Sequence, residues 1–239
     1  MKTNNDIKTL DKGKPLLFLG DHHGNWSELF FLAENKNLEN CHIISVGDLG
    51  IGFKYKKEYE YNLAKKLDEY FKERNITFYG IRGNHDNPYF FKGKNRICCD
   101  NFELIEDYTV MEYSGKKIQF IGGAISIDRL ARKEGISYWS GEHVNFNKDK
   151  CEKVDILVTH TAPSWCFPQQ FNELVYGWAR EDKQLLEELT NERGMMNSMF
   201  ELCAPTFHLY GHFHSSWTEN INNCTHRLLN INEIWEFRL

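Results

Sequence analysis

Short apolar runs and amphipathic segments alternate along the first third of the chain. The apolar runs are typical of strands and occupy residues 15–19, 42–46 and 76–81. Between them, apolar residues recur at the spacing of one helix face, first at Trp26, Leu29, Phe30 and Ala33 and then at Tyr59, Leu63, Leu67, Tyr70 and Phe71. This order of strands and helices predicts right-handed crossovers in a parallel sheet.

The second half of the chain has a different pattern, in which several strands follow one another without helices. Candidate strands lie near residues 102–105, 108–113, 117–122, 154–159, 206–210, 215–220, 225–231 and 233–237. Helical patterns occupy about 180–193, with a stop at Gly194, and about 196–203. Consecutive strands favour antiparallel pairing. With no repeat and no Pro/Gly/Ser-rich linker, we expect one domain over residues 1–239, a mixed α/β sandwich of two packed sheets flanked by helices.

Polar, ionisable side chains follow the C-terminal ends of five predicted strands. They occur in the stretches Gly20-Asp-His-His-Gly24, Gly47-Asp48, Gly83-Asn-His-Asp86, His160 and Gly211-His-Phe-His214. In open α/β sheets, ligands bind in the crevice outside these strand ends. Two of the stretches hold residues at i and i+2, Asp21 with His23 and His212 with His214, which point to the same side in extended backbone. We therefore expect these side chains to converge on one site.

The candidate ligands are carboxylate, imidazole and amide groups without sulfur: Asp21, His23, Asp48, Asn84, His160, His212 and His214. This donor set favours first-row metals over Ca²⁺, and we expect Mn²⁺, with Fe, Zn²⁺, Ni²⁺ and Co²⁺ as alternatives. Seven ligands are too many for one tetrahedral metal, but they suit two divalent ions that share a bridging carboxylate. Two metals about 3.5–4 Å apart can polarise a phosphoryl group and activate water.

In order and spacing, the five motifs resemble those of the calcineurin-like metallophosphoesterase superfamily, and they span residues 20–214. The resemblance implies a four-layer αββα sandwich and in-line attack on phosphorus by a hydroxide that bridges the two metal ions. It assigns Asp21, His23, Asp48 and His214 to one metal, and Asp48, Asn84, His160 and His212 to the other. His85 and the bridging Asp48 would be the catalytic residues. His85 would face the substrate and contact the phosphate or protonate the leaving oxygen.

The second motif departs from the Gly-Asp-x-x-Asp-Arg pattern of many phosphatases of this superfamily. Ile51 stands where that pattern has the Asp that orients the catalytic histidine, and Gly52 replaces the Arg that binds phosphate. Protein serine/threonine phosphatase activity of that type is therefore not expected. Asp86 is a candidate to orient His85, although adjacent residues in a loop often diverge.

Another cation must then bind the substrate phosphate. The candidates are Arg82, directly before the third motif, and Arg129 and Arg132, which follow a predicted strand end at Gly122-Gly123. We prefer Arg129 because it lies closer to that strand end. For any one of the three, a surface salt bridge is the competing interpretation.

Composition narrows the class of substrate. The net charge of −5 argues against an extended nucleic-acid surface. We therefore expect a small phosphorylated substrate and a phosphomonoesterase or small-nucleotide hydrolase. Aromatic residues in 163–178 could stack a nucleobase or pin the loop to the core. The alternative is a phosphodiesterase or nuclease acting on cyclic nucleotides, dinucleotides or nucleic acid. A non-catalytic binding scaffold is disfavoured because every ligand position and His85 are filled.

Cysteine usage and hydropathy predict a cytoplasmic protein. The seven cysteines are irregularly spaced without a Cys-x-x-Cys pair, which argues against a disulfide framework and against a thiolate zinc site. The first six residues are polar and lack the apolar centre of a secretory signal. No apolar stretch approaches the roughly 20 residues of a membrane span, so we expect no membrane partner. The sequence leaves the oligomeric state open.

Overall fold

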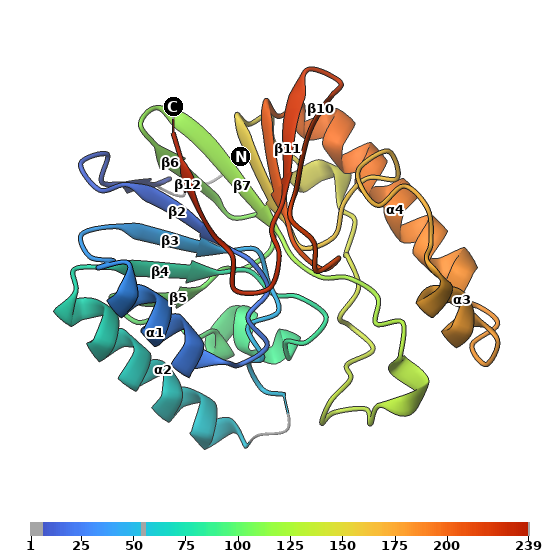
Figure 1. Ribbon diagram of the computed structural model, residues 1–239, viewed down its shortest axis with the longest axis horizontal. Helices are drawn as coiled ribbons and strands as arrows, with labels where there is room; N and C mark the ends of the chain where they lie inside the picture. The colour runs from blue at the N-terminus through green and yellow to red at the C-terminus, as the bar shows by residue number, and fades with distance from the viewer. Residues whose placement is uncertain (1–6, 54–55, 239) are drawn as a thin grey trace.

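The computed structural model describes residues 7–53 and 56–238, in which two β-sheets pack face to face with helices on their outer faces (Figure 1). The four-layer αββα sandwich with two mixed sheets is thereby confirmed. The polar residues 1–6, on which the absence of a secretory signal was argued, lie outside the described residues. In the described part of the chain, no helix has both the length and the apolar character that crossing a membrane requires.

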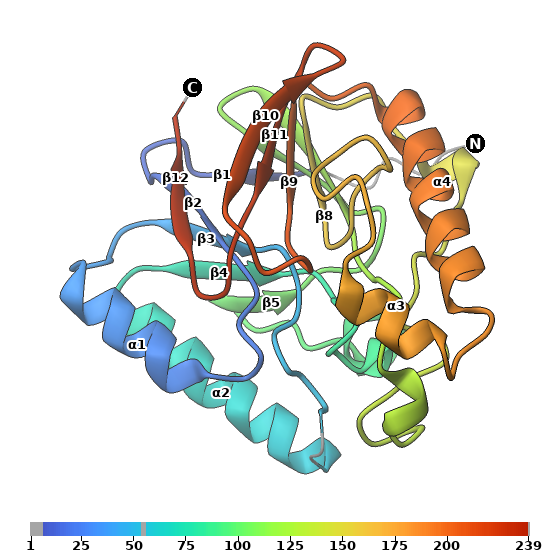
Figure 2. The ribbon, with the colours of Figure 1, turned by 45° about the vertical axis from the view of Figure 1, so that its right-hand side comes forward.

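The smaller sheet contains the strands that alternate with helices in the first third of the chain. Its five strands run in the order β12 (Ile234–Phe237), β2 (Leu16–Leu19), β3 (His42–Ser45), β4 (Thr77–Gly80) and β5 (Phe102–Leu104). The last four are mutually parallel, as the crossovers predict, and β12 is antiparallel to β2. Helices α1 (Trp26–Asn35) and α2 (Lys57–Glu73) lie on its outer side (Figure 2).

The larger sheet is less antiparallel than the sequence pattern indicates. Its seven strands run in the order β1 (Lys8–Leu10), β6 (Val110–Tyr113), β7 (Lys116–Ile121), β8 (Ile156–Thr159), β9 (Phe207–Tyr210), β11 (Cys224–Leu228) and β10 (Trp217–Ile221). The β6–β7 and β10–β11 pairs are antiparallel, whereas the other neighbours are parallel. The short strand β1 was not predicted, because three residues carry too little pattern.

The helices of the larger sheet differ from the prediction. One helix, α4 (Leu185–Cys203), runs through Gly194 without a break. Buried residues continue on both sides of the glycine, Leu189 in a cluster with Ile125 and Val175 and Met196 against the larger sheet, so tertiary packing outweighs the local helix-breaking tendency. Helix α3 (Glu173–Ala179) occupies part of a segment expected to be a loop. Single 3₁₀ turns lie at Pro88–Phe91, Gly93–Asn95, Arg129–Ala131 and Lys148–Lys150.

The apolar core has three layers that hold the sheets and helices together. Between the sheets, Phe18 and Ile44 of the smaller sheet pack with Phe120 and Val158 of the larger one. A second cluster joins the smaller sheet to α1 and α2, and a third joins the larger sheet to α4. This packing brings the C-terminal ends of β2, β3, β4, β8 and β9 to the same edge of the sandwich, where the sequence motifs lie.

Candidate metal centre

Four of the motif side chains from strands β2, β3 and β9 form one compact group. The ligand atoms of Asp21, His23, Asp48 and His214 all lie within 4.8 Å of one another. His214 Nε2 is 3.2 Å from Asp21 Oδ2 and 3.0 Å from His23 Nε2. His23 Nε2 is 3.8 Å from Asp48 Oδ2. These are the four residues that the motif resemblance assigns to one metal ion.

A second group shares Asp48 and extends towards strands β4 and β8. Asp48 Oδ1 lies 3.2 Å from His160 Nε2. Asn84 Oδ1 lies 3.1 Å from the same nitrogen and 2.9 Å from His212 Nδ1. The far nitrogen of His160, Nδ1, is 2.8 Å from the carbonyl oxygen of Val46 and donates to it, which leaves Nε2 free to face the group. The structure thus brings all seven predicted ligands to one place, with Asp48 common to both halves.

The donor set and its charge fit divalent cations. Asp21 and Asp48 are both buried, and within the described residues neither forms an ion pair with a lysine or arginine. Burial alone would raise the pKa of Asp48, but the charge of His160 and its hydrogen bond hold that pKa well below its usual range. Buried carboxylates in a ring of imidazoles require a nearby positive charge. Among the described residues of the metal-free chain, only protonated histidine lies close enough to supply it.

The backbone turns sharply at most of these ligands. His23, Asp48, His212 and His214 have positive φ angles between 48° and 70°. The expectation that the i, i+2 pairs lie in extended backbone is therefore wrong, and the pairs converge because each loop folds back on itself. Such left-handed residues cost about 1–3 kcal/mol each and persist where surrounding contacts hold them, typically at functional sites.

Two residues of the third motif hold the motif loops together. A Cβ atom at Gly83 would lie 2.0 Å from Asp48 Oδ1, so only glycine permits this approach. The Asp86 carboxylate accepts hydrogen bonds from the amides of Gly83, Leu49 and Ile51, at 2.8, 3.1 and 2.9 Å. Asp86 therefore joins the second and third motif loops, and its side chain is not the group that orients His85.

His85 is held by other neighbours. Its ring stacks on Phe53, with centroids 5.1 Å apart, and packs edge-on against His23 at 4.7 Å. Arg132 Nη2 lies 2.8 Å from His85 Nε2 and donates to it, so this ring nitrogen is unprotonated. Burial, together with the charge of Arg132, lowers the pKa of His85 to about 4.

Two of the three candidate phosphate-binding arginines, including the preferred Arg129, do not reach this site. Arg82 pairs with Asp107 at 2.7 Å and donates to the carbonyls of residues 141–143. Arg129 pairs with Asp182 at 2.6 Å and with Glu188. Neither lines the cavity beside the metal candidates, whereas Arg132, the third candidate, does. Carboxylates on distant segments of the chain determine where Arg82 and Arg129 lie. The position of an arginine after a strand does not reveal these ion pairs.

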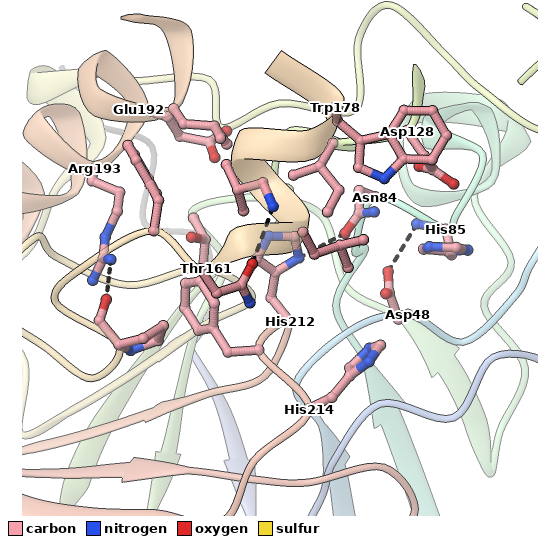
Figure 3. Close-up of a pocket in the computed structure, with 18 of the residues that line it drawn as sticks. Asp48, Asn84, His85, Asp128, Thr161, Trp178, Glu192, Arg193, His212 and His214 are labelled. Atoms are coloured by element: carbon pink, nitrogen blue, oxygen red, sulfur yellow. Dashed lines mark hydrogen bonds between the residues drawn. The ribbon is translucent and has the colours of Figure 1, made fainter. Parts of the chain in front are cut away.

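A cavity of about 440 Å³ opens directly onto the candidate ligands. Asp48, Asn84, His212 and His214 lie on one side of it, and Trp178 of α3 lies across from them (Figure 3). Apolar residues of α3 and α4 complete that far wall: Leu174, Val175, Trp178 and Leu189. The sequence contains a signal that could have predicted helix α3. Asn172 caps the helix by accepting a hydrogen bond from the Val175 amide, and apolar residues follow it.

A family model described as calcineurin-like phosphoesterase matches residues 14–216, which include all five motifs. The chain belongs to this family. The members of this family are described as phosphoesterases, and they use divalent metals in a binuclear centre. The paired ligand groups of this phosphoesterase lie at the position where the fold brings the five strand ends together.

The solved structures that resemble this chain include the following two. One is a putative 5′-nucleotidase from Staphylococcus aureus in complex with alpha-ketoglutarate, with a TM-score of 0.48, 10% identity and coverage of 92% of this chain and 50% of that one. The other is phosphopantetheinyl hydrolase from Mycobacterium tuberculosis, with a TM-score of 0.46, 12% identity and coverage of 92% and 90%. The chain thus spans half the length of the first. A search of curated proteins finds no match to the sequence.

Proposed function

We propose that this phosphoesterase hydrolyses a small phosphomonoester, as a phosphomonoesterase or small-nucleotide hydrolase. The observation that carries the proposal is the cavity of about 440 Å³, which has the candidate metal ligands on one side and an apolar wall on the other. A volume of this size suits a small-molecule ligand rather than a polymer. The net charge of −5 also disfavours an extended polyanion.

The seven converging side chains would hold two divalent ions. One ion would be bound by Asp21, His23, Asp48 and His214. The other would be bound by Asp48, Asn84, His160 and His212. Bound there, two metals polarise the phosphoryl group and activate water. Asp48 would be shared between them, because its Oδ1 faces His160 and its Oδ2 faces His23. Mn²⁺ suits this mixed carboxylate, imidazole and amide set, as do Fe, Co²⁺, Ni²⁺ and Zn²⁺.

Arg132 and His85 would bind the substrate phosphate together. The guanidinium already points at His85 Nε2, and both side chains line the cavity. A phosphate oxygen entering there accepts the hydrogen bond that Arg132 now gives to His85. The negative charge of the ester favours the protonated imidazole, which can then donate from Nε2 to the leaving oxygen.

The apolar wall would receive the organic part of the ester. Trp178, Phe171 and Val175 line the cavity opposite the ligands and offer ring and aliphatic surface. An aromatic or other largely apolar group, such as a nucleobase, buries well against such a wall. The wall therefore favours a substrate with a compact ring over a highly charged polymer.

Hydrolysis of two simple esters tests the proposal. Metal-stripped protein receives Mn²⁺, Co²⁺, Ni²⁺, Zn²⁺ or Fe²⁺ and is assayed with para-nitrophenyl phosphate and bis-para-nitrophenyl phosphate. We expect metal-dependent turnover of the monoester, lost in Asp48→Asn and His85→Ala. Asp155→Asn is the matched control, because Asp155 pairs with Lys116 at the opposite end of β8.

The outcomes separate the alternatives. Faster cleavage of the diester, or of oligonucleotides, would replace the monoesterase with the phosphodiesterase. Absence of turnover with every metal, together with fewer than two bound metals per chain by elemental analysis, would support the non-catalytic scaffold. Two bound metals without turnover of either ester would contradict a broadly acting monoesterase and require a screen of nucleoside monophosphates.

A further inference from the structure

A second group of metal-binding side chain types lies buried away from the candidate metal centre. Cys166, His208 and His226 are each 0% exposed, and their ligand atoms lie within 4.8 Å of one another. Cys166 comes from the loop after β8, and the histidines are register partners on β9 and β11. None of the three belongs to the seven motif ligands.

Hydrogen bonds determine which nitrogen of each imidazole carries the proton. The Thr159 hydroxyl lies 2.5 Å from the Thr161 carbonyl oxygen and donates to it, so its oxygen accepts from His208 Nε2 at 2.8 Å. His226 Nε2 lies 3.3 Å from the Ile221 carbonyl oxygen, which can only accept. In both neutral rings the proton is therefore on Nε2, and Nδ1 presents a lone pair.

These two lone pairs face each other. His208 Nδ1 and His226 Nδ1 are 3.0 Å apart, and Cys166 Sγ is 3.1 Å from His226 Nδ1. The thiol proton can satisfy one nitrogen but leaves the contact between the two nitrogens without a hydrogen. A single cation placed among the three atoms would satisfy all of them. An outer N–H that donates to a hydroxyl or carbonyl is also the usual support of a metal-bound histidine.

We propose that Cys166, His208 and His226 bind one Zn²⁺ ion, separate from the binuclear centre. One thiolate and two imidazoles are ligands that zinc prefers, and the thiolate forms when the metal displaces the thiol proton. The absence of a Cys-x-x-Cys pair does not argue against this site, because its ligands come from a loop and two strands. His226 is 60 residues from Cys166 and 18 from His208.

The ion would fasten a wall of the substrate cavity to the larger sheet. The loop that carries Cys166 continues to Pro168, which lines that cavity. Other bonds hold the same loop, since Arg193 donates to the carbonyls of Pro163 and Cys166 and the Tyr210 hydroxyl donates to that of Phe167. Zinc at Cys166 therefore adds a link between this loop and strands β9 and β11.

Cobalt substitution distinguishes this site from the binuclear centre. The centre has no sulfur donor, so a thiolate-to-Co²⁺ charge-transfer band in the near ultraviolet reports the Cys166 site alone. We expect protein produced in cobalt-supplemented medium to show this band, and Zn²⁺ added during refolding to abolish it. Elemental analysis of zinc-grown protein should give one zinc per chain that is retained in Asp48→Asn.

Variants assign the band to its ligands. Cys166→Ser and His226→Gln should lose the band and one metal equivalent while keeping the two metals of the centre. Cys41→Ser is the matched control, because Cys41 is buried in the core beneath α1 and α2, and it should keep the band. The Arg193 bonds to the loop favour folding of Cys166→Ser, which circular dichroism checks.

The wild-type protein alone can overturn the proposal. One contradicting result is folded, cobalt-grown protein that lacks the charge-transfer band and holds no metal beyond the binuclear centre. It would show that a proton rather than a metal ion lies among the three side chains. A band that survives in folded Cys166→Ser but disappears in Cys41→Ser would also contradict it. Because the readouts are spectral and stoichiometric, they do not depend on hydrolysis of any ester.

Discussion

The guanidinium of Arg132 donates a hydrogen bond to Nε2 of His85 across 2.8 Å. Asp128 Oδ1, 2.7 Å from Arg132 Nη2, and Ser126 Oγ, 3.1 Å from Nη1, hold the arginine in this position. A cation thereby stands beside the candidate catalytic imidazole, although the second motif has Gly52 in place of the expected arginine. Under the proposed function, the positive charge that a phosphate ester requires would come from this different segment of the chain.

Replacement of Arg132 should weaken substrate turnover strongly. We expect Arg132→Ala to lower kcat/KM about 100-fold, which corresponds to about 2.7 kcal/mol of lost transition-state stabilisation. Arg132→Lys should recover only part of the loss, because lysine lacks the planar fork of donors. Steady-state hydrolysis of para-nitrophenyl phosphate measures both variants.

Arg129→Lys is the matched control for Arg132→Lys. It preserves the charge opposite Asp182 and Glu188, outside the cavity, and should leave kcat/KM near the wild-type value. If Arg129→Lys lost activity while Arg132→Lys did not, the original preference for Arg129 would stand and the assignment of Arg132 would be wrong.

A methyl group at Gly83 should disrupt the candidate metal centre. The added Cβ would lie 2.0 Å from Asp48 Oδ1, 2.4 Å from the Asp48 backbone nitrogen and 2.7 Å from His160 Nε2. We expect Gly83→Ala to lose metal and activity and to lower the free energy of unfolding by about 1–3 kcal/mol. Gly141→Ala, where a Cβ meets open space, is the control for elemental analysis and urea unfolding.

The buried carboxyl group of Glu142 should make stability depend on pH. Burial raises the pKa of Glu142 to about 8 from its usual 4.5. The folded chain therefore keeps this proton where the unfolded chain has lost it, so the contribution of Glu142 to stability is full below pH 4.5 and declines as the pH rises towards 8.

Glu142→Gln isolates this contribution. The amide oxygen can still accept from the Ser126 amide, which now donates to Glu142 Oε1 at 2.6 Å, but the side chain cannot ionise. We expect the stability of the variant, measured by urea unfolding, to fall less than that of the wild type between pH 5 and 8. Parallel pH curves for the two proteins would show that Glu142 does not titrate in this range.

Gly194 offers a stabilising substitution. It lies on the exposed side of α4, and an added Cβ meets nothing within 4 Å. Gly194→Ala should raise the free energy of unfolding by about 1 kcal/mol, because alanine loses less backbone entropy in a helix. A decrease in the thermal midpoint would indicate that the helix needs a flexible point there.

The local pattern of apolar and polar residues predicted many of the helices and strands, because their formation depends on neighbours in sequence. The spacing of Trp26, Leu29 and Ala33 predicts helix α1, and these three residues are buried as expected. Gly194 shows the limit of such signals. Its local tendency indicates a stop, yet buried residues before it pack against α3 and those after it pack against the larger sheet, and this packing keeps the helix intact. Antiparallel pairing was over-predicted for the same reason, because contacts throughout the sandwich determine which strands pair.

The sequence by itself determined the family, the two-sheet architecture and the set of candidate metal ligands. Parallel strands end at one edge of a sheet, so the positions of Asp21 and Asp48 after neighbouring parallel strands already imply that they meet. Only the tertiary structure decided that Arg132 rather than Arg129 lies beside His85, and that Cys166 meets two histidines from other strands. These contacts join segments far apart in the chain, and packing and counter-charges select them without a local sequence signal.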